Sequence, residues 1–221
     1  MHESSLHASI KTRFTQDVNQ QEVYVDGFLI DAVCEDLLVE IQTRNFYQLK
    51  AKLCTLLKNY KVRIVHPIAA EKWIIYLPAD GDEAIRRRKS PKHGRYEHLF
   101  RELVYISQFV FDKNFSILIL LIHEEEIRRD DGLGSWRRKG WSIIDRRLIE
   151  VTDQILLSSV NDYQMFLPEN LPQPFTTRNL SLSLHIPHRL AQKMAYCLRS
   201  MDIISLSDKR GRENLYLTRC G

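Results

Sequence analysis

The sequence predicts an α/β fold, in which helices flank a mixed central sheet, followed by a small helix-turn-helix domain with a strand hairpin. Up to about residue 157, short runs rich in Val, Ile, Leu and Phe alternate with segments whose apolar residues recur at helical spacing. The chain then changes character, because Pro168, Pro172 and Pro174 interrupt it before two helical patterns and two short strands. We therefore expect one domain over residues 1–157 and a second over residues 158–221.

The composition is that of an ordinary soluble protein. The 221 residues are 44% hydrophobic and 27% charged, and the net charge of +4 permits nucleic-acid binding without requiring it. The four cysteines lie far apart and lack the CxxC spacing of a zinc site, which indicates reduced thiols. The N-terminus has no apolar signal segment, and the longest apolar run, at residues 115–122, is too short to span a bilayer. We expect a cytoplasmic protein with no membrane contact.

The elements of the first domain follow from the spacing of its apolar residues. Leu6, Ile10 and Phe14 recur at near-helical intervals and predict a helix over residues 4–14. The elements expected after it are strands at 25–33 and 38–42, a helix at 46–60, strands at 62–68 and 72–77, a polar loop at 79–94, a helix at 96–110, a buried strand at 116–122 and a helix at 142–157. We interpret the acidic run at residues 124–126 as solvated surface charge.

Two carboxylates are expected to meet on the first pair of strands. The polar break at residues 34–37 separates the two apolar runs and predicts the connecting loop. Val33 then pairs with Leu38, and counting away from the loop along both strands places Asp31 directly opposite Glu40. Opposed carboxylates on paired strands are destabilising, and a divalent cation turns this repulsion into ligation.

Side-chain alternation places these groups on one face of the sheet. Glu40 and Gln42 share a face of their strand, whereas Val39 and Ile41 point toward the core. Acidic residues near hairpin turns are also common as solvated surface charges. However, Glu40 lies inside the apolar run LLVEIQ, where a charged group needs a partner or a metal. The sequence therefore predicts a metal site.

This pattern resembles the PD-(D/E)XK nuclease superfamily, whose fold is restriction-endonuclease-like, over residues 1 to about 155. The matching features are a strand with Gly27 that ends in Asp31, a short turn, and a hydrophobic strand with Glu40-x-Gln42 before a helix. The resemblance implies that Asp31, Glu40 and the backbone carbonyl of Ile41 hold Mg²⁺ or Mn²⁺. It also implies that the metal activates a water for phosphodiester hydrolysis in DNA.

The sequence departs from the superfamily at one position, where Gln42 replaces the usual lysine. Glutamine can orient a water by hydrogen bonds, but it cannot supply positive charge to an attacking hydroxide. Lys50 or Lys52 on the following helix is a candidate source of that charge. The resemblance further implies an accessory acid from the N-terminal helix, for which Glu3 is the candidate.

The second domain shows the order helix, turn, helix and basic hairpin. Thr176 or Thr177 is a good N-cap for a helix to about Leu184, and Pro187 suits the first position of the next helix. That next helix turns one face inward and the other outward; the inward residues are Leu190, Met194, Leu198 and Met201, and the outward ones are Arg189, Gln192, Tyr196 and Arg199. Strands expected at 203–207 and 214–218 flank a basic turn at 208–213.

This order resembles a winged helix domain from about residue 160 to the end. In DNA-binding members the second helix enters the major groove and the hairpin contacts the backbone. The resemblance implies that Arg189, Gln192 and Arg199 read DNA, and that the hairpin residues Lys209, Arg210 and Arg212 contact phosphates. Many winged helices bind protein instead, so that alternative stays open.

Two further basic clusters lie in the first domain. Residues 86–89 read Arg-Arg-Arg-Lys, and the tryptophans Trp136 and Trp141 bracket a second run, Arg137–Lys139. Such runs are most often solvated faces. Aromatic side chains beside them also suit stacking on nucleic-acid bases.

The function predicted from these features is that of a metal-dependent DNA endonuclease with a winged helix for substrate engagement. The competing prediction is a nuclease fold without activity that serves as a DNA-binding or protein-interaction module, because Gln42 stands in place of the lysine. The sequence leaves open RNA as the substrate and a homodimer as the assembly.

Overall fold

The computed structural model describes residues 4–219 and shows a mixed α/β protein in which helices flank a large sheet. The chain divides into two compact units. The first unit contains the chain up to Ile41, Val65–Tyr96 and Ile119–Ile155, and the second contains Gln42–Ile64, Glu97–Leu118 and the chain from Leu156 onward. None of the helices within the described residues is long and apolar enough to cross a membrane.

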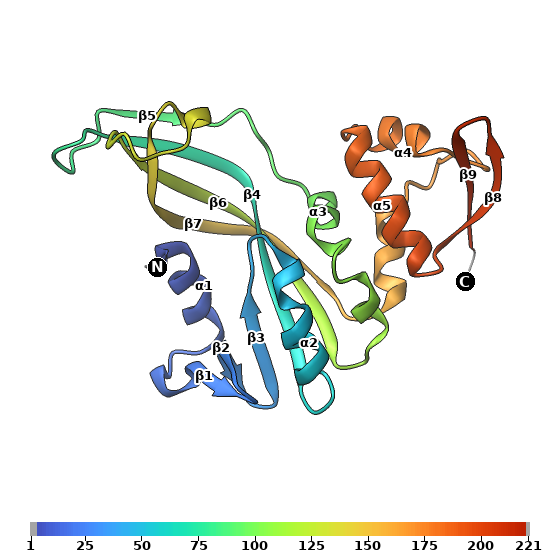
Figure 1. Ribbon diagram of the computed structural model, residues 1–221, viewed down its shortest axis with the longest axis horizontal. Coiled ribbons are helices and arrows are strands. Elements are labelled where there is room, and N and C mark those ends of the chain that lie inside the picture. The colour runs from blue at the N-terminus through green and yellow to red at the C-terminus, as the bar shows by residue number, and fades with distance from the viewer. Residues whose placement is uncertain (1–3, 220–221) are drawn as a thin grey trace. The chain divides into compact units, whose positions relative to one another are not determined.

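The described part of the chain forms a seven-stranded sheet with the order β1-β2-β3-β4-β6-β7, and β5 pairs with β4 (Figure 1). The strands are β1 (Gln21–Val25), β2 (Phe28–Cys34), β3 (Leu37–Ile41), β4 (Lys61–Leu77), β5 (Arg86–Lys89), β6 (Phe115–Arg129) and β7 (Ser142–Leu157). A separate two-stranded sheet contains β8 (Ile204–Arg210) and β9 (Glu213–Thr218).

The described residues contain both α-helices and short 3₁₀ helices. The α-helices are α1 (Ser5–Phe14), α2 (Lys50–Leu56), α3 (Phe100–Leu103), α4 (Thr177–Leu184) and α5 (His188–Ser200). The 3₁₀ helices are η1 (Val18–Gln20), η2 (Phe46–Leu49), η3 (Tyr96–Leu99), η4 (Ser107–Phe111), η5 (Trp136–Arg138) and η6 (Val160–Phe166). The helix predicted over 46–60 therefore begins as η2 and ends earlier, and the helix predicted over 96–110 is broken into η3, α3 and η4.

The predicted N-terminal helix is confirmed as α1. The side chain of Ser4 caps it by accepting a hydrogen bond from the backbone N–H of His7 at 3.3 Å. Leu6 and Ile10 are buried, as their spacing predicted. The strand predicted over 25–33 is confirmed from Phe28 onward as β2, but its first residues differ, because a turn with Gly27 at a φ of 84° separates β1 from β2.

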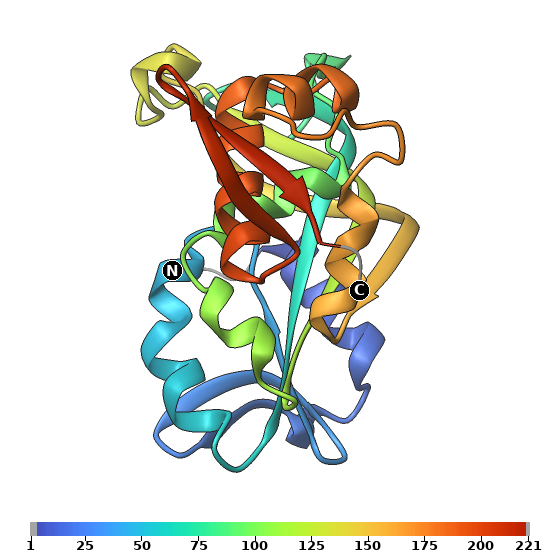
Figure 2. The same ribbon diagram turned by 90° about the vertical axis from the view of Figure 1, so that its right-hand side faces the viewer.

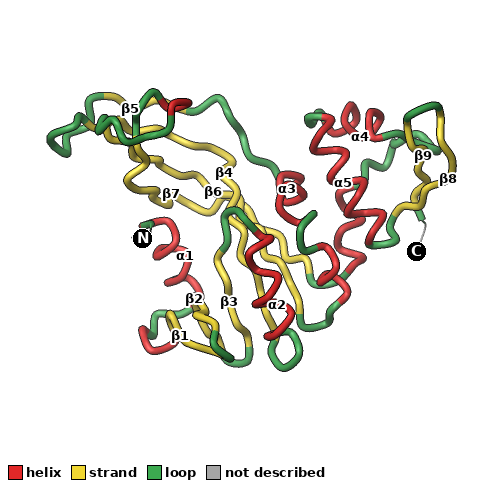
Figure 3. Tube along the Cα trace, in the orientation of Figure 1, coloured by secondary structure: helices red, strands yellow, loops and turns green. Residues whose placement is uncertain are grey.

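The helix predicted over residues 142–157 is also wrong, because this segment is the strand β7, drawn as a strand in Figure 3. Its apolar residues fit helical spacing, yet it is rich in β-branched residues, which favour strands. Pairing with β6 stabilises the strand rather than the helix. Thr152 adds a hydrogen bond to this edge, because its hydroxyl donates to the carbonyl of Leu121 at 3.1 Å.

Two more expectations fail around β4. The strands predicted at 62–68 and 72–77 form one continuous strand, Lys61–Leu77, and Pro67 lies within it. The loop predicted over 79–94 contains β5, which pairs with β4 through Trp73 with Lys89 and Tyr76 with Arg86. Four consecutive basic residues show no alternation of apolar and polar side chains. The sequence pattern therefore did not predict this strand.

The acidic run at residues 124–126 is not simply solvated, because Glu124 and Glu126 are buried in the first unit. The ammonium of Lys72 lies 2.7 Å from Glu124 Oε1 and 3.0 Å from Glu126 Oε2. Arg128 Nε donates to Glu126 Oε1 at 2.8 Å. Paired in this way, the two carboxylates satisfy the requirement that buried charges have partners.

This network predicts a pH-dependent contribution of Glu126 to stability. Burial alone would raise the pKa of Glu126, but Lys72 and Arg128 outweigh it and lower the pKa from 4.5 to about 2. The stabilisation is therefore fully present above pH 4.5 and is lost as the pH falls through about 2. We expect Glu126→Gln to lower the free energy of unfolding by about 3 kcal/mol at pH 7.

Urea unfolding between pH 7 and pH 2 would measure this loss, which should shrink toward the acid end. The control is Glu125→Gln, because Glu125 pairs with the exposed Arg87. A loss for Glu126→Gln that stays constant across the pH range would contradict the pairing as its cause.

The predicted elements after residue 175 are confirmed in the second unit (Figure 2). Thr176 is the N-cap of α4, and Asn179 completes the capping box. Pro187 stands one position before the predicted one, as the N-cap of α5. The inward residues of α5, namely Leu190, Met194, Leu198 and Met201, are all buried.

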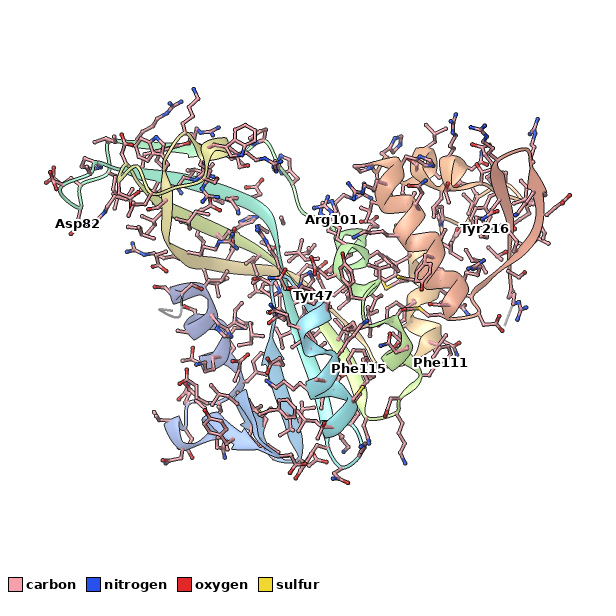
Figure 4. All side chains as sticks on the ribbon, in the orientation of Figure 1. Tyr47, Asp82, Arg101, Phe111, Phe115 and Tyr216 are labelled. Carbon is pink, nitrogen blue, oxygen red and sulfur yellow. The ribbon has the colours of Figure 1, made fainter. Side chains whose placement is uncertain are left out.

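Backbone hydrogen bonds join the β8–β9 hairpin to the segment just before α4. Phe175 and Tyr216 exchange backbone hydrogen bonds at 2.9 and 2.8 Å, and their ring centroids lie 5.8 Å apart. Figure 4 labels Tyr216 on the hairpin. Because β8 extends to Arg210, the predicted basic turn is shorter than expected and contains only Gly211 and Arg212.

Candidate active site and nucleic-acid interface

The β2–β3 hairpin has the predicted register. Val33 pairs with Leu38 and Ala32 with Val39, so continuing the ladder by one residue places Asp31 opposite Glu40. The connecting turn is tighter than predicted, because Cys34 pairs with Leu37 and only two residues remain between them.

One face of this hairpin is fully buried and the other partly, since Leu38, on the face of Glu40, is buried as well. Ala32, Val39 and Ile41 are buried on one face, as the alternation predicted for the latter two. Asp31 and Glu40 are half-buried on the opposite face. Helix α1 packs against β2 and β3 within the first unit (Figure 1). The carboxylates are therefore partly removed from water, which strengthens any interaction with a cation.

Asp31 contacts both the neighbouring strand and helix α1. Its Oδ2 accepts a hydrogen bond from the backbone N–H of Ile41 at 2.7 Å. The same oxygen lies 3.1 Å from Nε2 of His7, which projects from α1. The first contact joins Asp31 to the strand that carries Glu40, and the second joins it to the helix.

His7 is the residue near the site that the sequence did not reveal. It lies far from Asp31 in the chain, and no spacing marks it as a partner. Its position depends on how α1 is anchored: Asp145 on β7 accepts hydrogen bonds from the Ser5 backbone N–H at 2.9 Å and from the Ser5 hydroxyl at 2.7 Å. Burial raises the pKa of Asp145, but the hydrogen bonds from Ser5 and from the Arg146 N–H, together with the charge of Arg147, outweigh it and lower the pKa.

The donor set fits a hard divalent cation that keeps part of its water shell. Within residues 4–219, no three or more His, Cys, Asp or Glu side chains form a group that could hold a metal ion. Mg²⁺ is commonly bound by one or two carboxylates together with waters and substrate phosphates. Asp31 and Glu40 meet that smaller requirement, with the Ile41 carbonyl as a further oxygen next to them in the chain.

The other residues predicted for this site lie in different parts of the chain. Gln42 is the first residue of the second unit, and its side-chain amide donates to the carbonyl of Arg44. Lys50 and Lys52 belong to α2 of the same unit, Lys50 exposed and Lys52 half-buried. Glu3 lies outside the described residues.

The residues predicted to contact DNA are exposed in the second unit. On α5 these are Arg189, Gln192 and Arg199, and on the hairpin they are Lys209, Arg210 and Arg212. The neighbouring flank of α5 is held against α3 and η4, because Lys193 Nζ donates to the carbonyl of Arg101 at 2.7 Å and Ser200 Oγ lies 3.4 Å from Ser107 Oγ. The exposed stripe is thereby fixed in orientation.

Comparisons with known proteins identify a family without assigning an activity. The model of the domain of unknown function DUF8091 matches residues 4–158, so the chain belongs to that family. An uncharacterized protein of Treponema pallidum (strain Nichols) is 33% identical over 216 residues, which cover 97% of this chain and 84% of the relative. No solved structure matches the chain.

Proposed function

We propose that this DUF8091 protein is a metal-dependent nuclease that hydrolyses phosphodiester bonds in DNA. The observation that carries the proposal is the register of the β2–β3 hairpin, which, continued by one residue, brings the half-buried Asp31 opposite the half-buried Glu40. Opposed carboxylates on paired strands are an arrangement that a divalent cation converts from repulsion into ligation. The strand pair followed by η2 and α2 is also the order that the PD-(D/E)XK resemblance implies.

The roles of the residues follow from their contacts. Mg²⁺ or Mn²⁺, held by Asp31, Glu40 and the Ile41 carbonyl, would supply an activated water and neutralise charge on the scissile phosphate. The Ile41 N–H holds Oδ2 of Asp31 by a hydrogen bond and so fixes the orientation of the carboxylate. His7 contacts that same Oδ2 and acts as a positioning residue.

Gln42 follows Ile41 directly, and its amide would orient the attacking water. Lys50 and Lys52 are the candidate sources of the positive charge that Gln42 lacks. Glu3 would extend the acidic set from the N-terminal side.

We further propose that the region from η6 to β9 is a winged helix domain that engages the DNA substrate. Its support is the order α4, turn, α5 and β8–β9 hairpin, together with the exposure of the polar stripe on α5. Helix α5 would present Arg189, Gln192 and Arg199 to the major groove, and the hairpin would present its cations to the backbone.

The direct test of the proposed activity is a cleavage assay on supercoiled plasmid, single-stranded DNA and RNA. With Mg²⁺ or Mn²⁺ we expect DNA to be cut, and with EDTA in excess we expect no cutting. Cleavage that persists in EDTA would contradict a metal-dependent mechanism, and preferential cleavage of RNA would change the substrate class.

A binding module without activity is the second candidate. It is favoured by Gln42 in place of the lysine and by the small donor set in the described residues. In that case the exposed polar residues of α5 and the hairpin would bind the partner. Adding metal would then neither cleave DNA nor change the affinity of the protein for it.

The proposed hairpin contact predicts a change in salt dependence. Lys209, Arg210 and Arg212 are exposed, so replacing all three with Ala should preserve the fold. If each contacts one phosphate of duplex DNA, the slope of log affinity against log salt should become shallower by about 3.

The matched control replaces Lys58 and Lys113, exposed cations elsewhere in the second unit, and should leave the slope unchanged. Fluorescence anisotropy over a salt series measures both. An unchanged slope for the triple variant would favour a protein partner for this domain.

A further inference from the structure

The strand β5 carries a concentration of positive charge that neither the proposed metal site nor the proposed winged helix uses. Arg86, Arg87, Arg88 and Lys89 are consecutive and all exposed. They belong to the first unit, and their strand pairs with residues 73–76 of β4. Because side chains alternate along a strand, the four cations divide into two pairs on opposite faces.

One pair is neutralised by acidic neighbours. Arg87 lies over the ring of Trp73, and its Nε is 3.1 Å from Glu125 Oε1. Lys89 lies over the same ring, and its Nζ is 2.5 Å from Glu71 Oε1. This face is a set of surface ion pairs and needs no ligand.

The other pair is not neutralised in this way. Arg86, Arg88 and Arg128 each place their guanidinium carbon 5.9 Å from the ring centroid of Tyr76, and Arg88 Nε donates to the Tyr76 hydroxyl at 3.1 Å. Neither Arg86 nor Arg88 forms an ion pair with any residue in the range 4–219. Gathering guanidinium groups around one ring costs repulsion, which an anion between them would relieve.

The acidic loop between β4 and β5 does not supply that anion. Asp82, labelled in Figure 4 on this loop, instead contacts Arg129 at 2.6 Å. Arg128 contacts the buried Glu126. The two β5 guanidinium groups therefore keep their charge available to an external partner.

An aromatic side chain is presented beside this cluster. Trp141 meets the Tyr76 ring edge to face with centroids 4.8 Å apart, which places the loop at residues 130–141 next to the arginines. In the same loop Trp136 is 82% exposed, with Arg137 over its ring at 5.4 Å. An exposed indole ring beside cationic side chains is a surface on which an unpaired base can stack.

The loop holds this tryptophan in a defined backbone conformation. The Gly134 N–H donates to the Gly140 carbonyl at 2.7 Å, and Arg138 Nε donates to the Trp141 carbonyl at 3.0 Å. A Cβ at Gly134 would lie 1.9 Å from the Trp141 carbonyl oxygen, so only glycine permits this closure. The exposure of Trp136 is therefore built into a closed loop.

We infer that Arg86, Arg88 and Trp136 bind single-stranded nucleic acid. The two guanidinium groups would contact successive phosphates, and the indole ring would stack on a base. Stacking on an exposed side chain requires an unpaired base, which is why the single strand is favoured over the duplex. Positive charge on an edge strand can have the sole role of preventing aggregation between sheets. That role does not account for the exposed ring of Trp136.

The test measures binding of the full-length protein to a labelled oligothymidylate and to a duplex of equal length, in EDTA so that nothing is cut. Arg86→Ala with Arg88→Ala should make the salt slope on the single strand shallower by about 1.4, from about 0.7 per lost phosphate contact. The matched control is Arg87→Ala with Lys89→Ala, which removes the same charge from the opposite face and should leave the slope unchanged.

The tryptophan is tested on the same substrates. Trp136→Ala should weaken single-strand binding by about tenfold and leave duplex binding unchanged, and Trp136→Phe should retain most of the affinity. Equal effects of the two charge variants, or no effect of Trp136→Ala, would overturn the inference. Because the assay contains no metal and leaves the hairpin intact, failure of the nuclease or winged helix proposals would not alter its result.

Discussion

Asp31→Asn and Glu40→Gln are each expected to reduce metal-dependent DNA cleavage by at least about 100-fold while the protein stays folded. Both substitutions remove a negative ligand but keep the size of the side chain. The amide oxygen introduced by Asp31→Asn can still accept the hydrogen bond that the Ile41 N–H donates to Asp31 Oδ2 in the wild-type protein. The loss should therefore lie in metal binding rather than in the hairpin.

Three measurements separate these effects. Initial cleavage rates give the activity, calorimetric titration with Mn²⁺ gives the metal affinity, and thermal unfolding gives the stability. Glu83→Gln is the control, because Glu83 is an exposed acid on the loop after β4 in the same unit. Cleavage retained in either site variant would show that the chemistry lies elsewhere in the chain.

The part of the candidate site that the sequence predicted depends on local geometry alone. Once the break between the two strands is located, the pairing of Val33 with Leu38 fixes that of Ala32 with Val39, and the next step along both strands brings Asp31 opposite Glu40. The same holds for the α4 cap, where Thr176 and Asn179 lie within one turn. Such features require no knowledge of how distant segments pack.

The features that the sequence missed depend on contacts between distant segments. His7 reaches Asp31 only because Ser5 anchors α1 to Asp145 on β7. Glu126 is buried because Lys72, on a different strand, neutralises it. Neither contact produces a regular spacing of residues that the sequence alone would reveal.

The incorrect helix at residues 142–157 has a related cause. Its residues Ile143, Leu148, Val151 and Ile155 satisfy a helical spacing, but they lie half-buried in a strand at one end of the sheet order. An edge strand of this kind has no clean alternation of apolar and polar residues. Tertiary pairing therefore overrides the pattern.

Gln42 distinguishes an active nuclease from a binding module. If its amide orients the attacking water, Gln42→Ala should slow cleavage by about 10- to 1,000-fold while Mn²⁺ affinity at Asp31 and Glu40 is retained. In the structure the amide donates to the carbonyl of Arg44, so a stability measurement must accompany the rate. Gln48→Ala, a nearby exposed glutamine in the same unit, is the control.

Gln42→Lys tests whether a positive charge at this position supports cleavage, because it introduces the residue type usual in the superfamily that the hairpin resembles. If the site is otherwise complete, the ammonium group adds the positive charge that glutamine lacks, and the cleavage rate should be maintained or increased. If Lys50 or Lys52 already supplies that charge, the rate should not change, and Lys50→Ala or Lys52→Ala should then reduce it. A wild-type protein that binds Mn²⁺ through Asp31 and Glu40, cuts neither DNA nor RNA, and gains no cutting from Gln42→Lys would contradict the nuclease proposal. The binding module would then be the better account of the same fold.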